Sequence, residues 1–385
     1  MPNLLRSILA LISCLSAIVC FSALMSKAAF AQEAAFPNTS PMSKAQGQMG
    51  QWQWISVPGM TCRDGSSTGI GVRLQPGASA VMIYFQGGGF CADGESCRQN
   101  ANVPFAGANY GEAKFQNWAR GMGQRGIFNT RRAKNPVSKW NHVLIPYCTG
   151  DLHGGTRRNA FVPGVAQPQQ FVGKSNYAHA LKLIAPYFRN ASDVGISGSS
   201  AGGLGVILNY EQTVQAFGGR SVAALVDSAP VLPNTEFETE CLYRTGVNTF
   251  GVQIPLDCPE CHDPARGGLV NIYQFLAKKY PQGRFALASQ DADLAGVILF
   301  NKYSRECGGR GVNIFNYRRA LLTLRDDYIG GSWSTFFAPG LQHTITQDDG
   351  LYFQKRREFG QSMAEWIPSM NRKPPTHLPA KKRRK

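Results

Sequence analysis

The chain has 385 residues, of which 43% are hydrophobic and 17% are charged. A chain of this length can bury a sizeable core, and a single large domain lies within the usual range. The sequence holds no internal repeat, which excludes a repeat array, and its formal net charge of +16 makes the surface basic and attractive to polyanions.

The first 31 residues have the pattern of a secretory signal peptide. Arg6 precedes an apolar stretch over residues 8–25, and Ala29-Phe30-Ala31 supplies small residues at the cleavage positions. We therefore expect cleavage before Gln32 and a mature protein that is secreted, periplasmic or extracellular. A retained membrane anchor is the alternative, because the apolar run is near the lower limit for a span. No other stretch is apolar and long enough for a stable transmembrane span.

Three segments follow the leader. Residues 32–53 are polar and are expected to pack loosely, whereas residues 54–370 should form one large domain. Residues 371–385 contain several prolines and end in five consecutive basic residues, which predicts a solvated basic tail. Removal of the leader takes away Arg6 and Lys27, and the formal charge then falls by 2, to +14.

A glycine-rich loop follows an early buried strand. Residues 79–85 have the apolar pattern of that strand, and Gly87-Gly88-Gly89 comes directly after Gln86. Glycine alone lets backbone N–H groups approach a ligand closely, and α/β-hydrolases use such a loop in their oxyanion hole. We predict Gly88 and Gly89 as the donors. A tight turn is the alternative for the triplet taken alone.

A second motif has the pattern of a nucleophile elbow. Gly198-Ser199-Ser200-Ala201-Gly202-Gly203 is a G-x-S-x-G element centred on Ser200, between residues 194–197, which suit a strand, and residues 204–214, which suit a helix. Small residues must flank the serine because the turn crowds its own backbone. The N–H of Ala201 would lie at the start of the helix, where unpaired donors and the helix dipole favour an oxyanion.

His343 is the candidate general base. The chain has 6 histidines, and His343 lies in a loop after an aromatic stretch near the C-terminal end. In α/β-hydrolases the acid and then the histidine follow the serine along the chain. His153 lies in a loop that could line a pocket, but it precedes Ser200.

The sequence leaves the acid open among three aspartates. Residues 284–290 suit a strand with Asp291 at its C-terminal end, which is where open α/β sheets build their sites. We therefore favour Asp291. Asp293 is a near alternative, and Asp227, at the end of a strand over residues 222–226, is the main structural competitor.

The wider pattern predicts the fold. Strands near residues 80, 143, 194, 223 and 285 alternate with helical stretches such as residues 171–187 and 268–279. This alternation indicates an α/β fold of the α/β-hydrolase type, with a mostly parallel sheet and helices on both faces. Residues 235–267 form an insertion that we expect to be a Cys-rich cap.

These motifs resemble those of the pectin acetylesterase family, which also contains the Notum carboxylesterases. The likeness runs from residue 54 to residue 364, through the segments Phe85–Cys91, Ile145–Asp151 and Ser197–Gly203 and the positions Asp227-Ser228, Asp291 and His343. It implies an α/β-hydrolase fold. It also implies a catalytic triad of Ser200, Asp291 and His343, and oxyanion donors at Gly88, Gly89 and Ala201.

Eight cysteines remain after removal of the leader: Cys62, Cys91, Cys97, Cys148, Cys241, Cys258, Cys261 and Cys307. An even number in an exported chain predicts disulfides. Cys91 with Cys97 could close a loop behind the oxyanion glycines, Cys62 with Cys148 could tie an early segment to a core strand, and the other four could make two more bridges. The sequence leaves this connectivity open.

The segment Cys258-Pro259-Glu260-Cys261-His262 also matches the C-x-x-C-H pattern of covalent haem attachment. A disulfide-bonded hydrolase explains both cysteines without haem. A zinc site there would lack a second ligand pair at finger-like spacing.

The motifs therefore predict an exported serine esterase with no metal or organic cofactor, and the resemblance implies that it deacetylates an acetylated polysaccharide such as pectin. Its partners would be an acylated polysaccharide or another ester, together with an anionic polymer or envelope surface, rather than nucleic acid. The basic charge could instead serve solubility alone. The alternatives are a carboxylesterase that removes longer acyl chains from lipid or protein, and a catalytically silent carbohydrate- or envelope-binding protein.

Overall fold

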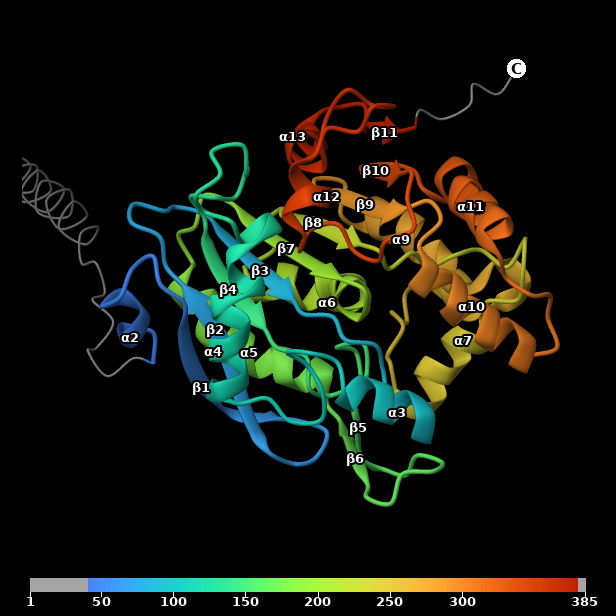
Figure 1. Ribbon diagram of the computed structural model, residues 1–385, viewed down its shortest axis with the longest axis horizontal. Coiled ribbons are helices and arrows are strands. Elements are labelled where there is room, and N and C mark those ends of the chain that lie inside the picture. The colour runs from blue at the N-terminus through green and yellow to red at the C-terminus, as the bar shows by residue number, and fades with distance from the viewer. Residues whose placement is uncertain (1–40, 380–385) are drawn as a thin grey trace, which may run out of the picture. The chain divides into compact units, whose positions relative to one another are not determined.

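A nine-stranded sheet, in the order β1-β2-β4-β3-β7-β8-β9-β10-β11, forms the frame of the computed structural model, which describes residues 41–379 (Figure 1). The chain divides into residues 1–43 and 44–385, and this sheet belongs to the second unit. The pairs β1–β2 and β2–β4 are antiparallel, and every other neighbouring pair is parallel. The strands are β1 Gln53–Thr61, β2 Ser67–Arg73, β3 Val81–Phe85, β4 Asn141–Ile145, β7 Val194–Ser199, β8 Val222–Asp227, β9 Arg284–Gln290, β10 Trp333–Ala338 and β11 His377–Leu378.

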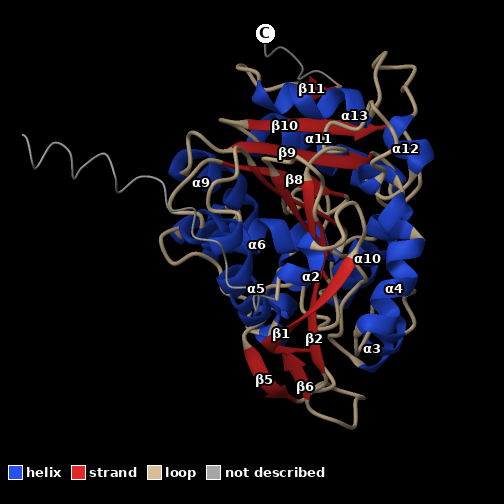
Figure 2. Ribbon diagram, turned by 90° about the vertical axis from the view of Figure 1, so that its left-hand side faces the viewer, coloured by secondary structure: helices blue, strands red, loops and turns tan. Residues whose placement is uncertain are grey.

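Helices cover both faces of this sheet, with α5, α6 and α9 on one side and α4 and α12 on the other (Figure 2). All residues of β3, β4 and β7 are buried, as expected for parallel strands that are covered on two sides. The helices are α2 Ser43–Gln46, α3 Gly94–Ala101, α4 Glu112–Arg120, α5 Gly173–Tyr187, α6 Ala201–Ala216, α7 Glu240–Thr245, α8 Pro259–His262, α9 Ile272–Lys279, α10 Leu294–Glu306, α11 Ile314–Thr323, α12 Asp349–Phe353 and α13 Met363–Trp366.

Short elements complete the described part of the chain. Strands β5 Arg157–Ala160 and β6 Gln169–Phe171 form a separate antiparallel pair. The 3₁₀ turns are η1 Met122–Gln124, η2 Gly126–Phe128, η4 Pro264–Arg266, η5 Gly268–Asn271 and η7 Ile367–Asn371, and the π-helical turns are η3 Gly246–Phe250 and η6 Leu324–Tyr328. The predicted α/β class and the mostly parallel sheet are therefore confirmed.

An aromatic cluster fixes the N-terminal edge of the sheet. Trp52, which is 6% exposed, packs edge-on against Trp118 of α4 with the ring centroids 5.0 Å apart. Burial of such a side chain contributes roughly 1.5–3 kcal/mol relative to exposure. The segment that we expected to pack loosely up to residue 53 thus ends earlier, because Trp52 is in the core and Gln53 begins β1.

The C-terminal segment also differs from expectation. Residues 371–379 are not a separate solvated tail, because β11 pairs in parallel with β10 and extends the sheet by one strand. The expected leader (residues 1–31) and the basic end (residues 380–385) lie outside the described residues. Within residues 41–379, no helix combines the length and apolar character that a membrane span requires.

Four disulfides join the eight cysteines of the described residues: Cys62–Cys148, Cys91–Cys97, Cys241–Cys307 and Cys258–Cys261. The first two are the bridges that the sequence suggested. The last takes up both sulfur atoms of the C-x-x-C-H segment. The Cys241–Cys307 bridge ties α7 of the insertion over residues 235–267 to the end of α10, so the expected Cys-rich cap is present.

Candidate active site

Ser200 lies in the sharp turn between β7 and α6, with φ of 56° and ψ of −128°. A non-glycine residue rarely adopts a positive φ, and the surrounding structure must hold it there. A Cβ atom at Gly198 would overlap the backbone oxygen of Gly202, and one at Gly202 would overlap that of Phe85. The turn therefore depends on the small residues that flank the serine.

Backbone donors surround this turn. Ala201 is the first residue of α6, so its N–H has no acceptor within the helix, and the positive end of the helix dipole lies there. The backbone N–H of Ser200 itself donates to the Asp227 carbonyl oxygen at 2.8 Å, which fixes the turn to β8. The elbow can therefore present an N–H at Ala201 beside the serine hydroxyl.

The glycine-rich loop after β3 lies against the elbow. A Cβ at Gly87 would overlap the backbone oxygen of Ser199, and Gly88 and Gly89 have φ of +155° and +70°. These conformations favour glycine. Three buried side chains donate to carbonyl oxygens of the loop: His153 Nε2 to Gln86 at 2.8 Å, Asn100 Nδ2 to Gly88 at 2.6 Å and Tyr147 Oη to Gly89 at 2.8 Å.

His153 therefore holds the glycine-rich loop through the Gln86 carbonyl and is not among the residues that line the cavity. The sequence had suggested that it could line a pocket. Its ring is 2% exposed, and burial lowers its pKa to about 4, so it is neutral near pH 7. Because the Gln86 carbonyl can only accept, Nε2 of His153 must carry the proton.

His343 pairs with Asp293 and not with Asp291. Nδ1 of His343 is 2.7 Å from Oδ2 of Asp293, whose side chain is fully buried, whereas the side chain of His343 is 31% exposed. The other oxygen of Asp293 accepts from the N–H of Gly296 at 3.1 Å and caps α10. The expectation that Asp291 orients His343 is wrong in this structure. The alternative, Asp293, holds the histidine.

Asp291 is engaged elsewhere. Its Oδ2 accepts from the guanidinium of Arg318 on α11, with Nε at 2.7 Å, and its Oδ1 accepts from the N–H of Gly340 at 3.3 Å. The carboxylate thus joins the end of β9 to α11 and to the loop after β10. Asp291 and Asp293 are two residues apart in the turn between β9 and α10. Their side chains contact different neighbours, Arg318 and His343.

Asp227 joins the elbow to the histidine loop. It is fully buried, and its carboxylate accepts from the hydroxyls of Ser199 (2.9 Å), Ser228 (3.0 Å) and Thr346 (2.7 Å) and from the N–H groups of Ile345 (2.9 Å) and Thr346 (2.8 Å). These contacts give Asp227 a structural role, whereas the sequence analysis had kept it as a competitor of Asp291 for the catalytic acid, and the histidine pairs with Asp293 instead. Ser199, the other serine of the motif, is likewise occupied by buried contacts.

The electrostatic surroundings of His343 favour its protonated form. Burial lowers the pKa of His343, but the hydrogen bond and the negative charge of Asp293 outweigh that effect, so the pKa lies above its ordinary value. A histidine that gains a proton easily while its other nitrogen is held by a carboxylate can act as a general base.

Ser200 and His343 line one cavity of about 710 Å³, together with Gly88, Gly89 and Ala201. Large apolar side chains make up much of the wall. They come from α6, from the cap and from α10: Leu204, Ile207, Leu208, Leu242, Tyr243, Phe250, Val252, Ile254, Ile298, Leu299 and Phe300. A cavity of this size lies within the range that holds a drug-sized ligand. Within residues 41–379, no group of three or more His, Cys, Asp or Glu side chains is placed to hold a metal ion.

The sheet order, the elbow and the loop define an α/β-hydrolase. The solved structure of the Wnt deacylase Notum from Drosophila has the same fold, with a TM-score of 0.61 and 19% sequence identity over 83% of this chain and 93% of that chain. A family model described as Pectinacetylesterase matches residues 43–262, more than half of the chain. The chain therefore belongs to the pectinacetylesterase family.

Curated relatives match over shorter stretches. Palmitoleoyl-protein carboxylesterase NOTUM of Drosophila melanogaster is 30% identical over 40% of this chain and 23% of its own length, and that of Homo sapiens is 26% identical over 52% and 42%. Pectin acetylesterase 7 of Arabidopsis thaliana is 30% identical over 40% of this chain and 38% of its own length. The chain thus matches less than half of each of these relatives.

Proposed function

We propose that this protein is an exported serine ester hydrolase. The observation that carries the proposal is the convergence of Ser200, His343 and the glycine-rich loop on one cavity, with Asp293 behind the histidine. Export is supported by the signal-peptide pattern and by four disulfides, which persist in oxidising compartments.

The reaction begins when His343 accepts the hydroxyl proton of Ser200 as the serine oxygen attacks the ester carbonyl. Asp293 orients the imidazole and stabilises its cation. The N–H groups of Gly88, Gly89 and Ala201 bind the negative charge that develops on the carbonyl oxygen. His343 then gives the proton to the departing alcohol, and water releases the acid by the same steps in reverse. This chemistry requires no metal or organic cofactor.

The cavity supports an apolar acyl group longer than acetyl. An acetyl group would fill a small part of about 710 Å³, and a polyhydroxyl sugar would find few partners on a wall of leucine, isoleucine and phenylalanine side chains. Relatives that are named as palmitoleoyl-protein carboxylesterases agree with this choice. The second candidate is deacetylation of a polysaccharide, which the family model, the pectin acetylesterase relative and the basic charge favour.

The test compares secreted wild-type protein with Ser200→Ala on p-nitrophenyl esters of increasing chain length and on acetylated pectin. We expect hydrolysis that rises from acetate to medium-length chains, and its loss in Ser200→Ala with the melting temperature unchanged. Labelling by a fluorophosphonate should require Ser200. Wild-type protein that is folded but neither labelled nor active would exclude an esterase, and activity on acetylated pectin alone would select the second candidate.

A further inference from the structure

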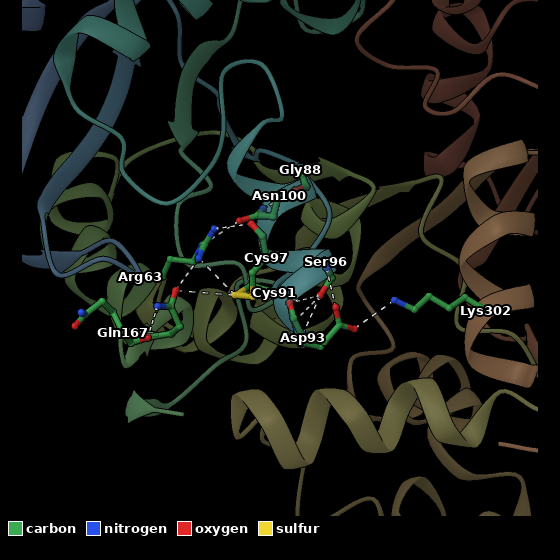
Figure 3. The surroundings of a disulfide bond; sticks show 11 residues. Arg63, Gly88, Cys91, Asp93, Ser96, Cys97, Asn100, Gln167 and Lys302 are labelled. Carbon is green, nitrogen blue, oxygen red and sulfur yellow. Dashed lines mark hydrogen bonds and ion pairs between the residues drawn. A yellow bond between two sulfur atoms is a disulfide. The ribbon is translucent and has the colours of Figure 1, made fainter. Parts of the chain in front are cut away.

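A buried cation stands behind the glycine-rich loop. Arg63 follows β1, is 4% exposed, and donates from its guanidinium to Asn100 Oδ1 at 3.1 Å, to Gln169 Oε1 at 2.6 Å and to the Cys97 carbonyl oxygen at 2.9 Å (Figure 3). These acceptors are neutral, and burial of a charged group among neutral groups costs free energy. The planar fork of the guanidinium nevertheless joins β6, through Gln169, to two positions of α3, Cys97 and Asn100.

Arg63 determines which way the Asn100 amide faces. A guanidinium can only donate, so the amide atom that it contacts must be the oxygen. The amide nitrogen of Asn100 is then turned to the carbonyl oxygen of Gly88, at 2.6 Å. Asn100 is 1% exposed, so a buried amide makes both contacts.

The contact with Gly88 sets the direction of the next N–H. In a trans peptide the C=O of one residue and the N–H of the following residue lie in one plane and point in opposite directions. By holding the Gly88 carbonyl, Asn100 fixes the N–H of Gly89 in the opposite direction within that plane. Gly89 is one of the expected oxyanion donors, and with no side chain at either glycine the loop has little steric restraint of its own.

We propose that Arg63 and Asn100 are positioning residues for the oxyanion hole: Arg63 orients the Asn100 amide, and Asn100 aims the N–H of Gly89. The inference rests on the proposed ester hydrolysis and extends it to two side chains that take no part in proton transfer. If the Gly89 N–H points in the wrong direction, the site binds the developing oxyanion more weakly, whereas binding of the ester changes less. We therefore expect kcat to fall and KM to change little.

Asn100→Asp tests this with an isostere. The carboxylate still accepts from Arg63 and gains a charge partner, but it cannot donate to the Gly88 carbonyl. We expect kcat on a p-nitrophenyl ester to fall about 10²-fold, the lower end for loss of one oxyanion donor, with KM within about threefold. Affinity for a boronic acid, which forms a tetrahedral adduct with the serine, should fall by a similar factor. Arg63→Lys keeps the charge but not the fork, and should give a smaller loss of kcat.

The matched control is Asn176→Asp. Asn176 is also buried, and its amide bridges the N–H and C=O of Thr61 at 3.0 and 2.8 Å, between α5 and β1 and outside the cavity. It should lower the melting temperature and leave kcat unchanged.

Wild-type kcat and boronate affinity in Asn100→Asp would overturn the inference, as would losses of kcat that follow the melting temperature alike in both variants. A wild-type enzyme that a fluorophosphonate does not label would instead overturn the proposed function, and this inference with it.

Discussion

Asp293 combines two tasks that are usually given to different residues. One carboxylate oxygen caps α10 through Gly296, and the other accepts from Nδ1 of His343. The cap fixes the carboxylate, and the carboxylate fixes the imidazole, so the orientation of the histidine is coupled to the first turn of α10. Asp291, two residues earlier, performs a structural task through Arg318.

We therefore expect Asp293→Asn to lower kcat by up to about 10⁴-fold, the scale seen when the acid of a Ser-His-Asp triad is neutralised. The effect has a second signature in pH. His343 must be neutral to accept a proton, so kcat/KM falls as the pH drops through its pKa. Asp293 raises that pKa, and the acidic limb of the wild-type profile therefore lies at a higher pH than in Asp293→Asn. The measurement is kcat/KM from pH 4 to pH 9.

Asp291→Asn is the control for this experiment. Its ion pair with Arg318 is about half exposed on the arginine side, and such pairs contribute roughly 1 kcal/mol or less. We expect a small fall in melting temperature and an acidic limb at the wild-type position. A limb that moves in Asp291→Asn and not in Asp293→Asn would return the catalytic acid to the earlier residue.

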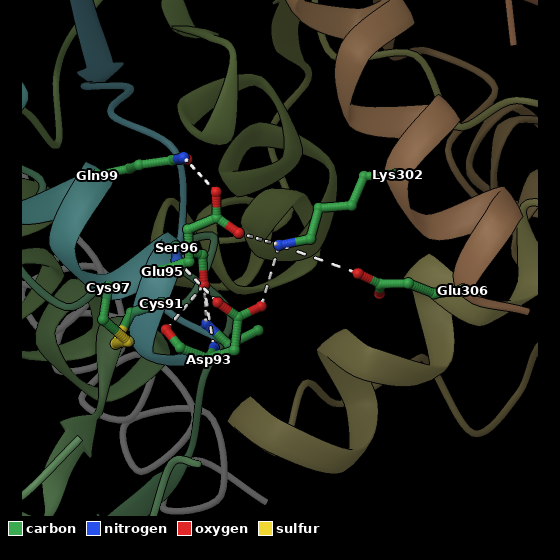
Figure 4. A network of polar contacts seen from close by, with 9 residues as sticks. Cys91, Asp93, Glu95, Ser96, Cys97, Gln99, Lys302 and Glu306 are labelled. Carbon is green, nitrogen blue, oxygen red and sulfur yellow. Dashed lines mark hydrogen bonds and ion pairs between the residues drawn. A yellow bond between two sulfur atoms is a disulfide. The ribbon is translucent and has the colours of Figure 1, made fainter. Parts of the chain in front are cut away.

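At the scale of elements, α3 forms a wall of the site and is held on two sides. Inside, the Cys91–Cys97 bridge closes the loop that precedes it. Outside, Lys302 of α10 reaches across to Asp93 at 3.3 Å and Glu95 at 3.2 Å (Figure 4). These ion pairs are partly exposed and contribute roughly 1 kcal/mol or less each, whereas closing a loop of this length contributes about 2 kcal/mol in the chain-entropy model. The disulfide is therefore a stronger restraint than either ion pair.

We expect the double variant Cys91→Ser/Cys97→Ser to lose catalysis before it loses its fold. Without the bridge, the chain between Gly89 and Asn100 is less restrained, and the loop donors lose aim chiefly in the transition state. Steady-state kinetics should show a lower kcat with KM little changed, while Lys302→Gln should affect neither strongly. The double variant with full kcat would show that the bridge has no part in the site, and eight free thiols in active secreted protein would contradict the disulfides themselves.

The sequence predicted the parts of the site whose geometry is local. The elbow and the glycine loop were visible because their glycines lie in short motifs, G-x-S-x-G and Gly-Gly-Gly, although the atoms that crowd Gly202 and Gly88 come from distant parts of the chain. The choice between Asp291 and Asp293 depended on where β9 ends and α10 begins, and a shift of two residues reverses it. An aspartate directly before a helix is a capping signal, but that signal does not say where the second oxygen points.

Residues that act across the chain were harder to find. Arg63 and Asn100 are 37 positions apart and meet only because β1, α3 and β6 converge. Nothing in the local pattern of either residue marks it, since a single arginine or asparagine is ordinarily a solvated surface residue. The sequence predicted a cap over residues 235–267, but the apolar wall of the cavity comes from α6, the cap and α10 together, and this wall favours an acyl group longer than the acetyl group that the resemblance implied.

For the whole molecule, β10 and β11 extend the sheet beyond the strand near residue 285, which was the last that the sequence analysis expected, and β11 forms the edge. β11 pairs with β10 at only two positions, Thr335 with His377 and Phe336 with Leu378, but further contacts hold this segment in place. The N–H of Thr335 donates to the Thr376 carbonyl at 3.0 Å, and Arg325, which is 2% exposed, donates from Nη1 to the Pro379 carbonyl at 2.9 Å. Without β11, the edge of β10 loses its partner strand, and Nη1 of Arg325 loses its acceptor, although the guanidinium keeps its ion pair with Asp326.

Truncation after Asn371 should therefore lower the melting temperature by several degrees and promote aggregation through the exposed edge of β10, whereas truncation after Pro379 removes the basic end and leaves β11 in place. The second variant is the control, and we expect it to match the full chain in melting temperature. Both should retain kcat at 25 °C, because β11 lies on the far side of β10 from the strands that carry Ser200 and Asp293. Thermal unfolding and light scattering of the three proteins side by side provide the measurement. If the chain truncated after Asn371 melts at the same temperature as the full chain, β11 does not stabilise the sheet. The residues after Asn371 would then behave as the solvated tail that the sequence predicted.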